Sequence, residues 1–343
     1  MLTIVISSTL ILGIMGAFFG AVLAYASQIF AVEIDPRIEK IASILPNANC
    51  GACGAVGCMA FAERVAAGDL AGNLCKPGGK TTAQGIGEIL GKDMESGPQM
   101  RAVVLCKGGD GIAKTRYVYD GIEDCTAAHI LSGGNKFCEY GCLGLGTCVR
   151  ACPFDAMEMG IDKLPNVFES MCTACGLCVQ ACPRGIMQLL PLQQRIYVAC
   201  VSHDKGKFVN EICSKGCNAC GLCANPKTTP SGEVTMVDNL PQIKFINNRN
   251  LVAGTYRCPK DTFANDVKFS SLQITEQCIG CPDEKKPPCV KACPVTDCVI
   301  RVTETGKYTI NQETCISCLL CVPVCPVNAI PYPIEENVSV EIS

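Results

Sequence analysis

Residues 3–32 form an apolar run without a charged side chain. A helix of this length, at about 1.5 Å of rise per residue, can cross a hydrocarbon layer of ~30 Å. The run therefore predicts a transmembrane helix over residues 1–32. Gly13, Gly16 and Gly20 lie on or near one face of that helix. Small residues at such spacing let two membrane helices pack closely, which favours a membrane partner over a plain anchor.

Charged residues begin directly after the run, at Glu33, Asp35, Arg37 and Lys40. No Lys or Arg precedes the run, and it is too long for the apolar part of a signal peptide. Because the basic side chains follow the helix, we expect a single-pass protein of the cell membrane whose remaining chain lies on the cytoplasmic side.

The rest of the chain shows only short periodic segments. Residues 59–68 predict a helix, and residues 102–105, 232–237 and 241–246 predict strands. Residues 298–315 predict a hairpin that turns at Thr305 and Gly306. Residues 76–100, rich in Gly and Thr, are expected to be a linker. Helices and paired strands of this kind indicate the α+β class.

Cysteines recur between these segments at spacings typical of ferredoxins. The pattern Cys-x2-Cys-x2-Cys-x3-Cys-Pro occurs at Cys172, Cys175, Cys178 and Cys182. In this pattern three thiolates bind one [4Fe-4S] cluster, and the Cys before Pro binds its neighbour. Cys152, which also precedes Pro, is therefore expected to complete the first of these sets. A zinc site would not require the third evenly spaced Cys.

The preceding loop departs from the pattern, because Leu145 occupies the middle ligand position. Its flanking cysteines remain, and the Cys-Pro of the second loop is expected to return to this cluster. Either of two upstream thiols could complete the set, and the nearer one is preferred. The predicted ligands are Cys138, Cys142, Cys148 and Cys182, with Cys125 as the alternative to Cys138.

A separate set precedes the ferredoxin-like loops and is expected to bind one [4Fe-4S] cluster. Its members are Cys50, Cys53, Cys58 and Cys75. Interspersed glycines let the backbone close around a bound group, and the helix predicted after them would direct its N-terminus at an anionic cluster. Zinc competes at this spacing taken alone, but the neighbouring loops favour iron.

After residue 183 the chain repeats itself in altered form. The segment CSKGCNACGLC matches CEYGCLGLGTC, so that Cys213 corresponds to Cys138. Most of the second loop of this copy is missing, and the thiols that remain suffice for one cluster. We expect this cluster at Cys217, Cys220, Cys223 and Cys258.

The last module is again a two-cluster ferredoxin, with an enlarged first loop. One cluster is expected at Cys278, Cys281, Cys289 and Cys325, and the other at Cys293, Cys315, Cys318 and Cys321.

These sets use 24 of the 29 cysteines for about six [4Fe-4S] clusters. The others are Cys106, Cys125, Cys200, Cys213 and Cys298. For Cys106 and Cys125 a structural role and a reserve role in ligation both remain open. The odd number and the Cys-x2-Cys spacing indicate a reducing compartment rather than a disulfide scaffold.

Composition narrows the partners. The 343 residues carry 29 basic and 32 acidic side chains, a net charge of −3, which provides no basic field for nucleic acid. The chain also has no Trp, so metal binding must contribute to the folding of its small modules.

The expected organisation follows the cysteine sets. A transmembrane helix occupies residues 1–32, a one-cluster domain residues 33–95, and a two-cluster ferredoxin module residues 96–192. A degenerate ferredoxin module, which has lost part of the cysteine pattern and keeps one cluster, spans residues 193–265. A second two-cluster module spans residues 266–333, and a tail spans residues 334–343.

The hydrophobic helix, the Cys-Gly-Ala-Cys-Gly loop at residues 50–54 with Cys-Lys-Pro-Gly-Gly at residues 75–79, and the tandem ferredoxin together resemble the B subunit of the Rnf complex. The likeness covers most of residues 1–190, and the C-terminal half resembles an extended, polyferredoxin form. The resemblance implies a subunit that accepts electrons from reduced soluble ferredoxin. It would pass them to membrane and flavin subunits that reduce NAD⁺ while Na⁺ or H⁺ is translocated.

The sequence contains no dinucleotide-binding glycine motif after a strand, no phosphate-binding loop and no paired acid and base. We therefore expect electron transfer without substrate chemistry on this chain. The alternatives are a membrane-anchored polyferredoxin that serves another reductase or hydrogenase, and a zinc-stapled interaction scaffold.

Overall fold

The computed structural model describes residues 2–29, 35–226, 228–229, 231–267, 271–282 and 284–331. The chain divides into two units, Met1–Ser96 and Gly97–Ser343. The first unit is helical, and the second combines short helices with two-stranded sheets. The α+β class expected from the sequence is thus confirmed.

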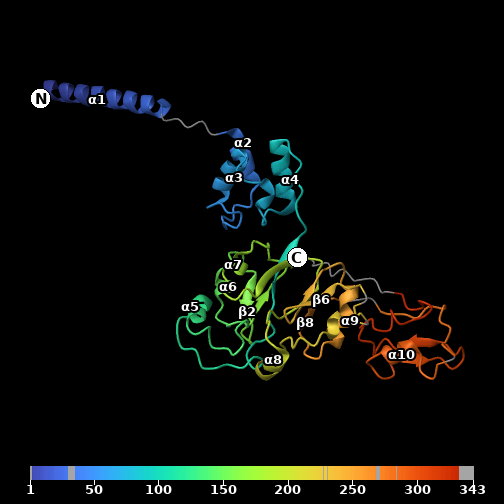
Figure 1. Cartoon of the computed structure of the whole chain (residues 1–343). Helices are drawn as coiled ribbons and strands as arrows, with labels where there is room; N and C mark the ends of the chain where they lie inside the picture. Colours follow the sequence, from blue (N-terminus) through green and yellow to red (C-terminus); the bar gives the residue numbers. More distant parts are fainter. Residues whose placement is uncertain are drawn as a thin grey trace. The chain divides into compact units, whose positions relative to one another are not determined.

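Helix α1 (Leu2–Ile29) is the predicted membrane helix (Figure 1). Its segment Ile6–Ile29 has a mean hydropathy of 2.0 and buries none of its side chains in the protein. Leu12 and Leu23, for example, are each 69% exposed. An apolar surface of this extent without protein contacts is typical of a helix that lies in lipid. Residues 30–32, the end of the predicted span, lie outside the described residues.

Three helices and one 3₁₀ turn follow within the first unit: α2 (Pro36–Ile44), α3 (Cys58–Ala67), η1 (Gly72–Leu74) and α4 (Gly79–Leu90). Helix α3 confirms the helix predicted over residues 59–68. Helix α4 shows that the predicted linker was wrong in its first half. Its Thr82, Ala83 and Ile86 recur at helical spacing and are buried against α2 and η1, a pattern that the intervening glycines obscured.

The second unit begins with a ferredoxin-like half. Strand β1 (Met100–Val104) pairs antiparallel with β4 (Met187–Pro191), so the ends of this half lie side by side. Strands β2 (Met157–Met159) and β3 (Pro165–Val167) form a hairpin between them. Short helices α5 (Cys125–Ile130), α6 (Thr147–Arg150) and α7 (Leu177–Gln180) lie in its cysteine-rich loops. Strand β1 includes residues 102–104 of the strand predicted over residues 102–105.

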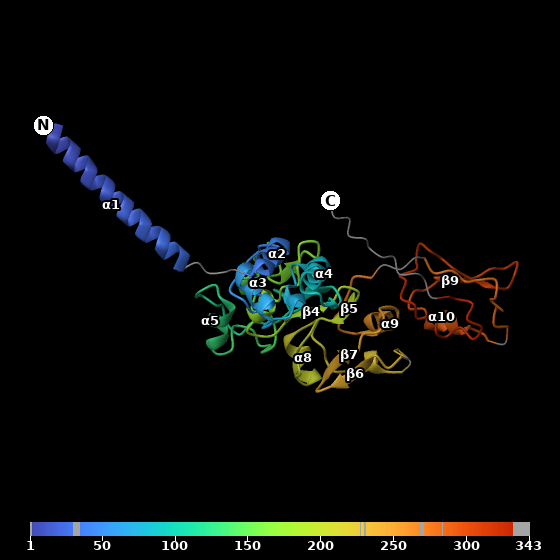
Figure 2. The same ribbon diagram turned by 90° about the horizontal axis from the view of Figure 1, so that it is seen from above.

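The duplicated half repeats this plan. Strand β5 (Ile196–Val198) pairs with β8 (Phe263–Asn265). Strand β6 (Val234–Val237) pairs with β7 (Leu240–Ile243), which confirms the predicted hairpin (Figure 2). Helix α8 (Gly206–Ile212) and turn η2 (Leu222–Ala224) precede the hairpin. Helix α9 (Arg249–Arg257) occupies the place of the missing second loop.

The last module contains α10 (Pro288–Ala292), which was not predicted, and the predicted hairpin, formed by β9 (Val299–Arg301) and β10 (Tyr308–Ile310). Its Leu272 and Leu319 belong to the same buried cluster as Ile196, Leu251 and Phe263 of the duplicated half. A shared apolar core therefore joins these two modules.

A charged cluster joins the first half to the second. The Glu169 carboxylate accepts hydrogen bonds from Arg101 at 3.2 Å and from Arg195 Nη2 at 2.8 Å. Arg101 lies on β1, Glu169 follows β3, and Arg195 precedes β5. Because the two arginines come from different halves, the carboxylate clamps the halves together.

Candidate iron–sulfur sites

The four cysteines of the first unit line one cavity with about 320 Å³ of empty volume. Burial raises the pKa of Cys75, and the nearby thiolates of Cys53, Cys58 and Cys50 raise it further. The Cys58 N–H, at the start of α3, donates to Asn49 Oδ1 at 2.8 Å. The structure thus gathers the full set predicted from the sequence.

In the second unit each cysteine loop contains a residue in the left-handed region two positions after its first Cys. These residues are Gly144, Ala174, Ala219, Gly280 and Ser317, with φ between 52° and 76°. A left-handed residue turns the backbone so that successive N–H groups point into the loop, which suits an anionic group. The Leu145 loop has the same backbone form, although it lacks the middle Cys.

The second loop of the first half assembles as predicted. Burial raises the pKa of Cys178 to about 12, and the thiolates of Cys175, Cys172, Cys148 and Cys152 contribute. Cys152 thus reaches this loop from the preceding one. Cys148, a predicted ligand of the first loop's cluster, is among the thiolates that raise the pKa of Cys178, so the ligand set of the first loop lies close to that of the second.

The first loop assembles differently from the preferred prediction. Burial raises the pKa of Cys148 to about 11, and the next contributions come from Cys125 and Cys182. The Cys125 N–H donates to Thr147 Oγ1 at 2.7 Å, and this hydroxyl donates to Asp124 at 3.0 Å. The start of α5 is therefore fixed beside Cys148.

Cys138, the preferred candidate, lies in another cavity, lined also by Cys106, Cys200 and Cys213. Burial raises the pKa of Cys138, and the contributing thiolates are those of Cys106 and Cys213. Cys142, which stays with the first loop, is near Cys148 as well as Cys106. The structure therefore favours the alternative ligand, Cys125. Its signal in the sequence is Asp124, a helix-capping residue directly before it.

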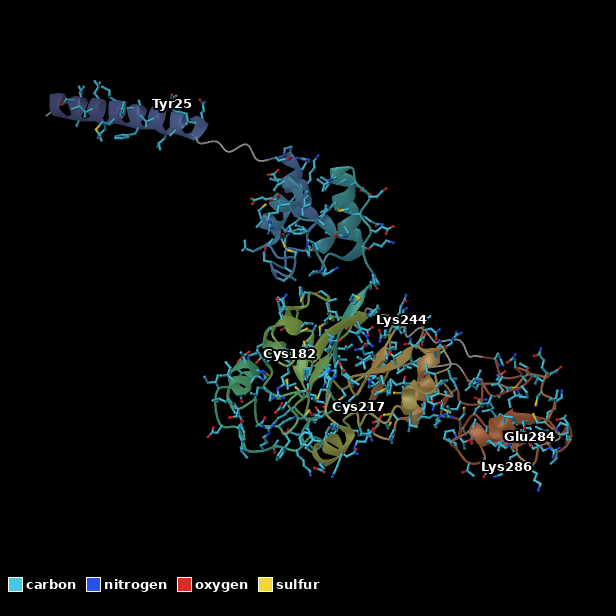
Figure 3. The ribbon with its side chains drawn as sticks, in the orientation of Figure 1. Tyr25, Cys182, Cys217, Lys244, Glu284 and Lys286 are labelled. Atoms are coloured by element: carbon cyan, nitrogen blue, oxygen red, sulfur yellow. The ribbon has the colours of Figure 1, made fainter. Side chains whose placement is uncertain are left out.

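The duplicated half gathers the four thiols expected there. Burial raises the pKa of Cys223 to about 11, with contributions from Cys217, Cys220 and Cys258. Figure 3 labels Cys217 in this half and Cys182 in the first. The Thr262 N–H donates to the Cys258 sulfur at 3.4 Å.

The last module gathers two sets. Burial raises the pKa of Cys321 to about 12, followed by contributions from Cys318, Cys293 and Cys315. These four thiols also line a cavity with about 310 Å³ of empty volume.

The other set of this module is more exposed. Burial raises the pKa of Cys289, and Cys281 and Cys325 contribute. Cys278 is the first thiolate to act on Cys281. The Ala329 N–H donates to the Cys325 sulfur at 3.2 Å.

This donor chemistry fits iron–sulfur clusters. Thiols with pKa values near 11 or 12 are protonated at neutral pH, and they become thiolates when iron binds and offsets their charge. Backbone N–H groups directed at the sulfurs stabilise the ligated form. Among the described residues, no group of three or more His, Cys, Asp or Glu side chains could hold a single metal ion. The Cys-x2-Cys-x2-Cys-x3-Cys-Pro pattern at Cys172–Cys182 favours clusters over zinc, because a zinc site does not require the third evenly spaced Cys.

Fold and sites together define a ferredoxin-type iron–sulfur protein with several [4Fe-4S] sites and a helix suited to a membrane. Comparisons with known families agree. An Fe-S cluster family matches residues 45–77, a 4Fe-4S dicluster domain residues 140–187, and a 4Fe-4S binding domain residues 308–330.

The relatives are more specific. The chain is 38% identical to the B subunit of the Na⁺-translocating ferredoxin:NAD⁺ oxidoreductase complex of Acetobacterium woodii, over 76% of this chain and 77% of that protein. It is 40% identical to the B subunit of the ion-translocating oxidoreductase complex of Methanosarcina acetivorans, over 71% of this chain and 91% of that protein. The chain belongs to the family of Rnf complex B subunits.

Proposed function

We propose that this chain is the iron–sulfur electron-transfer subunit of an ion-translocating ferredoxin:NAD⁺ oxidoreductase complex. It takes electrons from a reduced soluble ferredoxin and delivers them towards membrane and flavin subunits. Helix α1 anchors it in lipid, and the cysteine-rich modules lie on the cytoplasmic side. The observation that carries the proposal is the succession of four-thiol sets along both units.

The predicted ligand sets enter this proposal with one change. Cys125 takes the place of Cys138, because Cys125 and Cys182 both lie beside Cys148 whereas Cys138 lines another cavity. The sets are then Cys50, Cys53, Cys58 and Cys75; Cys125, Cys142, Cys148 and Cys182; Cys152, Cys172, Cys175 and Cys178; Cys217, Cys220, Cys223 and Cys258; Cys278, Cys281, Cys289 and Cys325; and Cys293, Cys315, Cys318 and Cys321.

When bound, a [4Fe-4S] cluster accepts and releases single electrons. The residues of the chain bind the clusters, shield them from water and hold neighbouring sets close together. Cys152 comes from the first loop but completes the set of the second, and Cys182 comes from the second loop but completes the set of the first. This exchange brings the two sets near each other. The coupling of electron transfer to Na⁺ or H⁺ movement belongs to the partner subunits, because the cysteine loops of this chain supply no path across a membrane.

The test uses the full-length chain, purified without oxygen in detergent. Reduced ferredoxin is mixed with it rapidly, and the visible absorbance of the clusters is followed. We expect bleaching within the mixing experiment and no change with oxidised ferredoxin. A colourless protein would contradict any electron-transfer role. A coloured protein that dithionite reduces and ferredoxin does not would refute the proposed donor.

The main alternative is a polyferredoxin that serves a different reductase or hydrogenase. Membership of the B-subunit family disfavours it. Affinity purification from membranes separates the two, since the proposal expects flavin-bearing subunits of the complex to be retained with this chain, and the alternative expects a reductase or hydrogenase instead.

A further inference from the structure

Four cysteines outside the six sets lie on one cavity, which is formed where the two ferredoxin halves meet. The cavity has about 430 Å³ of empty volume, compared with about 320 Å³ and 310 Å³ for two of the sites above. Its cysteines are Cys106, Cys138, Cys200 and Cys213. Most of the remaining lining is apolar, including Leu105, Ala199 and Ile212.

The two halves contribute corresponding thiols. Cys106 and Cys200 each follow the first strand of their half, and Cys138 and Cys213 each lie four residues before the first loop ligand. The halves touch directly here, since Ala113 of the first half forms a β-bridge with Cys213 of the second. The Lys114 N–H also donates to the Ile212 carbonyl at 2.8 Å. Each half therefore supplies two cysteines that belong to none of the six sets, and these cysteines meet where the halves are in contact.

The sulfurs of Cys106 and Cys213 lie close to each other, beside Gly108. A Cβ built on Gly108 would lie 3.5 Å from Cys106 Sγ and 3.6 Å from Cys213 Sγ, so both sulfurs lie on the same side of this backbone. A Cβ on Gly216 would lie 3.4 Å from Cys213 Sγ. Glycines at these positions leave room beside the sulfurs that a side chain would fill.

Backbone donors already surround these sulfurs, as they do at the assigned sites. The N–H groups of Gly108 and Cys142 donate to Cys106 Sγ at 3.3 Å and 3.4 Å. The Cys217 N–H donates to Cys200 Sγ at 3.5 Å. Burial raises the pKa of Cys200 to about 12. The donors would stabilise thiolate sulfur that is bound to iron.

A buried cation lies next to Gly108, which lines this cavity. Lys136 is 2% exposed, and its ammonium group donates to the Gly108 carbonyl at 2.6 Å. In the described part of the chain its only hydrogen-bond acceptor is this carbonyl, with no carboxylate ion pair. A buried ammonium needs nearby negative charge, and thiolate-ligated clusters on either side of Gly108 and Cys142 would supply it.

We propose that Cys106, Cys138, Cys200 and Cys213 together hold a seventh [4Fe-4S] cluster at the junction of the two halves. Each half gives two ligands. The Cys142 and Cys217 N–H contacts place this site next to the neighbouring site in each half, so it connects them. This inference rests on the proposed iron–sulfur function and adds a site to it.

The test counts iron and acid-labile sulfide in the full-length chain purified without oxygen. The unmodified chain should contain about 28 iron atoms rather than about 24. Cys106→Ser and Cys200→Ser, one from each half, should each lose about four, and the double variant should lose no more than either single one. Ile212→Val, which changes an apolar side chain on the same cavity and removes no thiol, is the matched control and should keep the full content.

The outcomes are distinct. Three outcomes would overturn the seventh cluster and leave the proposed function intact. The first is an iron content near 24 in the unmodified chain, and the second is one zinc atom per chain beside those 24 iron atoms. The third is a loss of iron in the double variant that equals the sum of the two single losses. Absence of iron would overturn both the seventh cluster and the proposed function. Reduced-state electron paramagnetic resonance gives an independent count, because the variants should lose one spin relative to the unmodified chain if the shared site exists.

Discussion

Glu169 is the residue whose replacement should loosen the join between the two ferredoxin halves. Its carboxylate binds Arg101 and Arg195, whose side chains are 10% and 24% exposed, and its own side chain is 20% exposed. The Cys172 N–H donates to the Glu169 carbonyl at 3.2 Å, so the clamp also adjoins a ligand. We expect Glu169→Gln to destabilise the join without removing any thiol.

The magnitude follows from these contacts. Charge-assisted hydrogen bonds contribute about 1.5–3 kcal/mol each, and breaking a fully buried pair costs about 3–5 kcal/mol. Arg101 keeps its bond to the Gln194 carbonyl at 3.1 Å, and the pair is partly exposed to water, which screens it. We therefore expect Glu169→Gln to lower the free energy of unfolding by about 2 kcal/mol. If this loss lowers the barrier to opening, the rate rises by roughly 30-fold.

The assay follows the bleaching of cluster absorbance at a fixed guanidinium concentration without oxygen, because cluster loss is irreversible and stability is then a rate. Glu139→Gln is the matched control. Glu139 pairs with Arg116 at 3.6 Å, but its side chain is 76% exposed, so its loss should cost less than about 1 kcal/mol. Similar bleaching rates for the two variants would refute the assignment of Glu169 as a clamp.

Three further predictions concern single sites. Cys125→Ser should remove about four iron atoms, and Cys125→Ser with Cys138→Ser about eight; an unchanged iron content in Cys125→Ser would return Cys138 to the first ferredoxin set. Gly280→Ala should remove about four iron atoms, because its Cβ would lie 2.6 Å from the Gly306 carbonyl oxygen. Gly221 is also left-handed but has open space around it, so Gly221→Ala should keep its cluster. Equal iron contents in the two variants would contradict this. Gly16→Ile combined with Gly20→Ile should reduce the retention of partner subunits in affinity purification, because it removes the small residues that let two membrane helices pack closely, while Leu12→Ile should not. The double variant and the Leu12→Ile control should both remain in the membrane fraction. Unchanged retention in the double variant would make α1 a plain anchor.

The elements with strong periodicity were predictable from the sequence, and those without it were not. Helix α1 and the hairpins β6–β7 and β9–β10 follow from local composition and turn residues. Helix α4 escaped prediction because its glycines suggested a linker, although Ile86 is completely buried against the first-unit core. Tertiary packing overrode the weak local preference.

The four-thiol sets divide in the same way. Sets whose members share one loop, or follow the Cys-Pro rule, could be proposed from spacing alone, since a short loop leaves few ways to place its thiols. The choice between Cys125 and Cys138 could not, because each lies outside the regular spacing. Thr147 and Asp124 favour Cys125, because they fix the start of α5 beside Cys148.

The sequence by itself therefore indicated the chemistry, which is thiolate ligation of iron–sulfur clusters behind an apolar helix. Only the tertiary structure decided which distant thiols meet. Two duplicated halves pack with Ala113 against Cys213, and this contact brings Cys106 and Cys200 to the same cavity although they are far apart in the chain. Spacing along a chain fixes neighbours within a loop, whereas the meeting of two halves depends on the surfaces that each half folds to present.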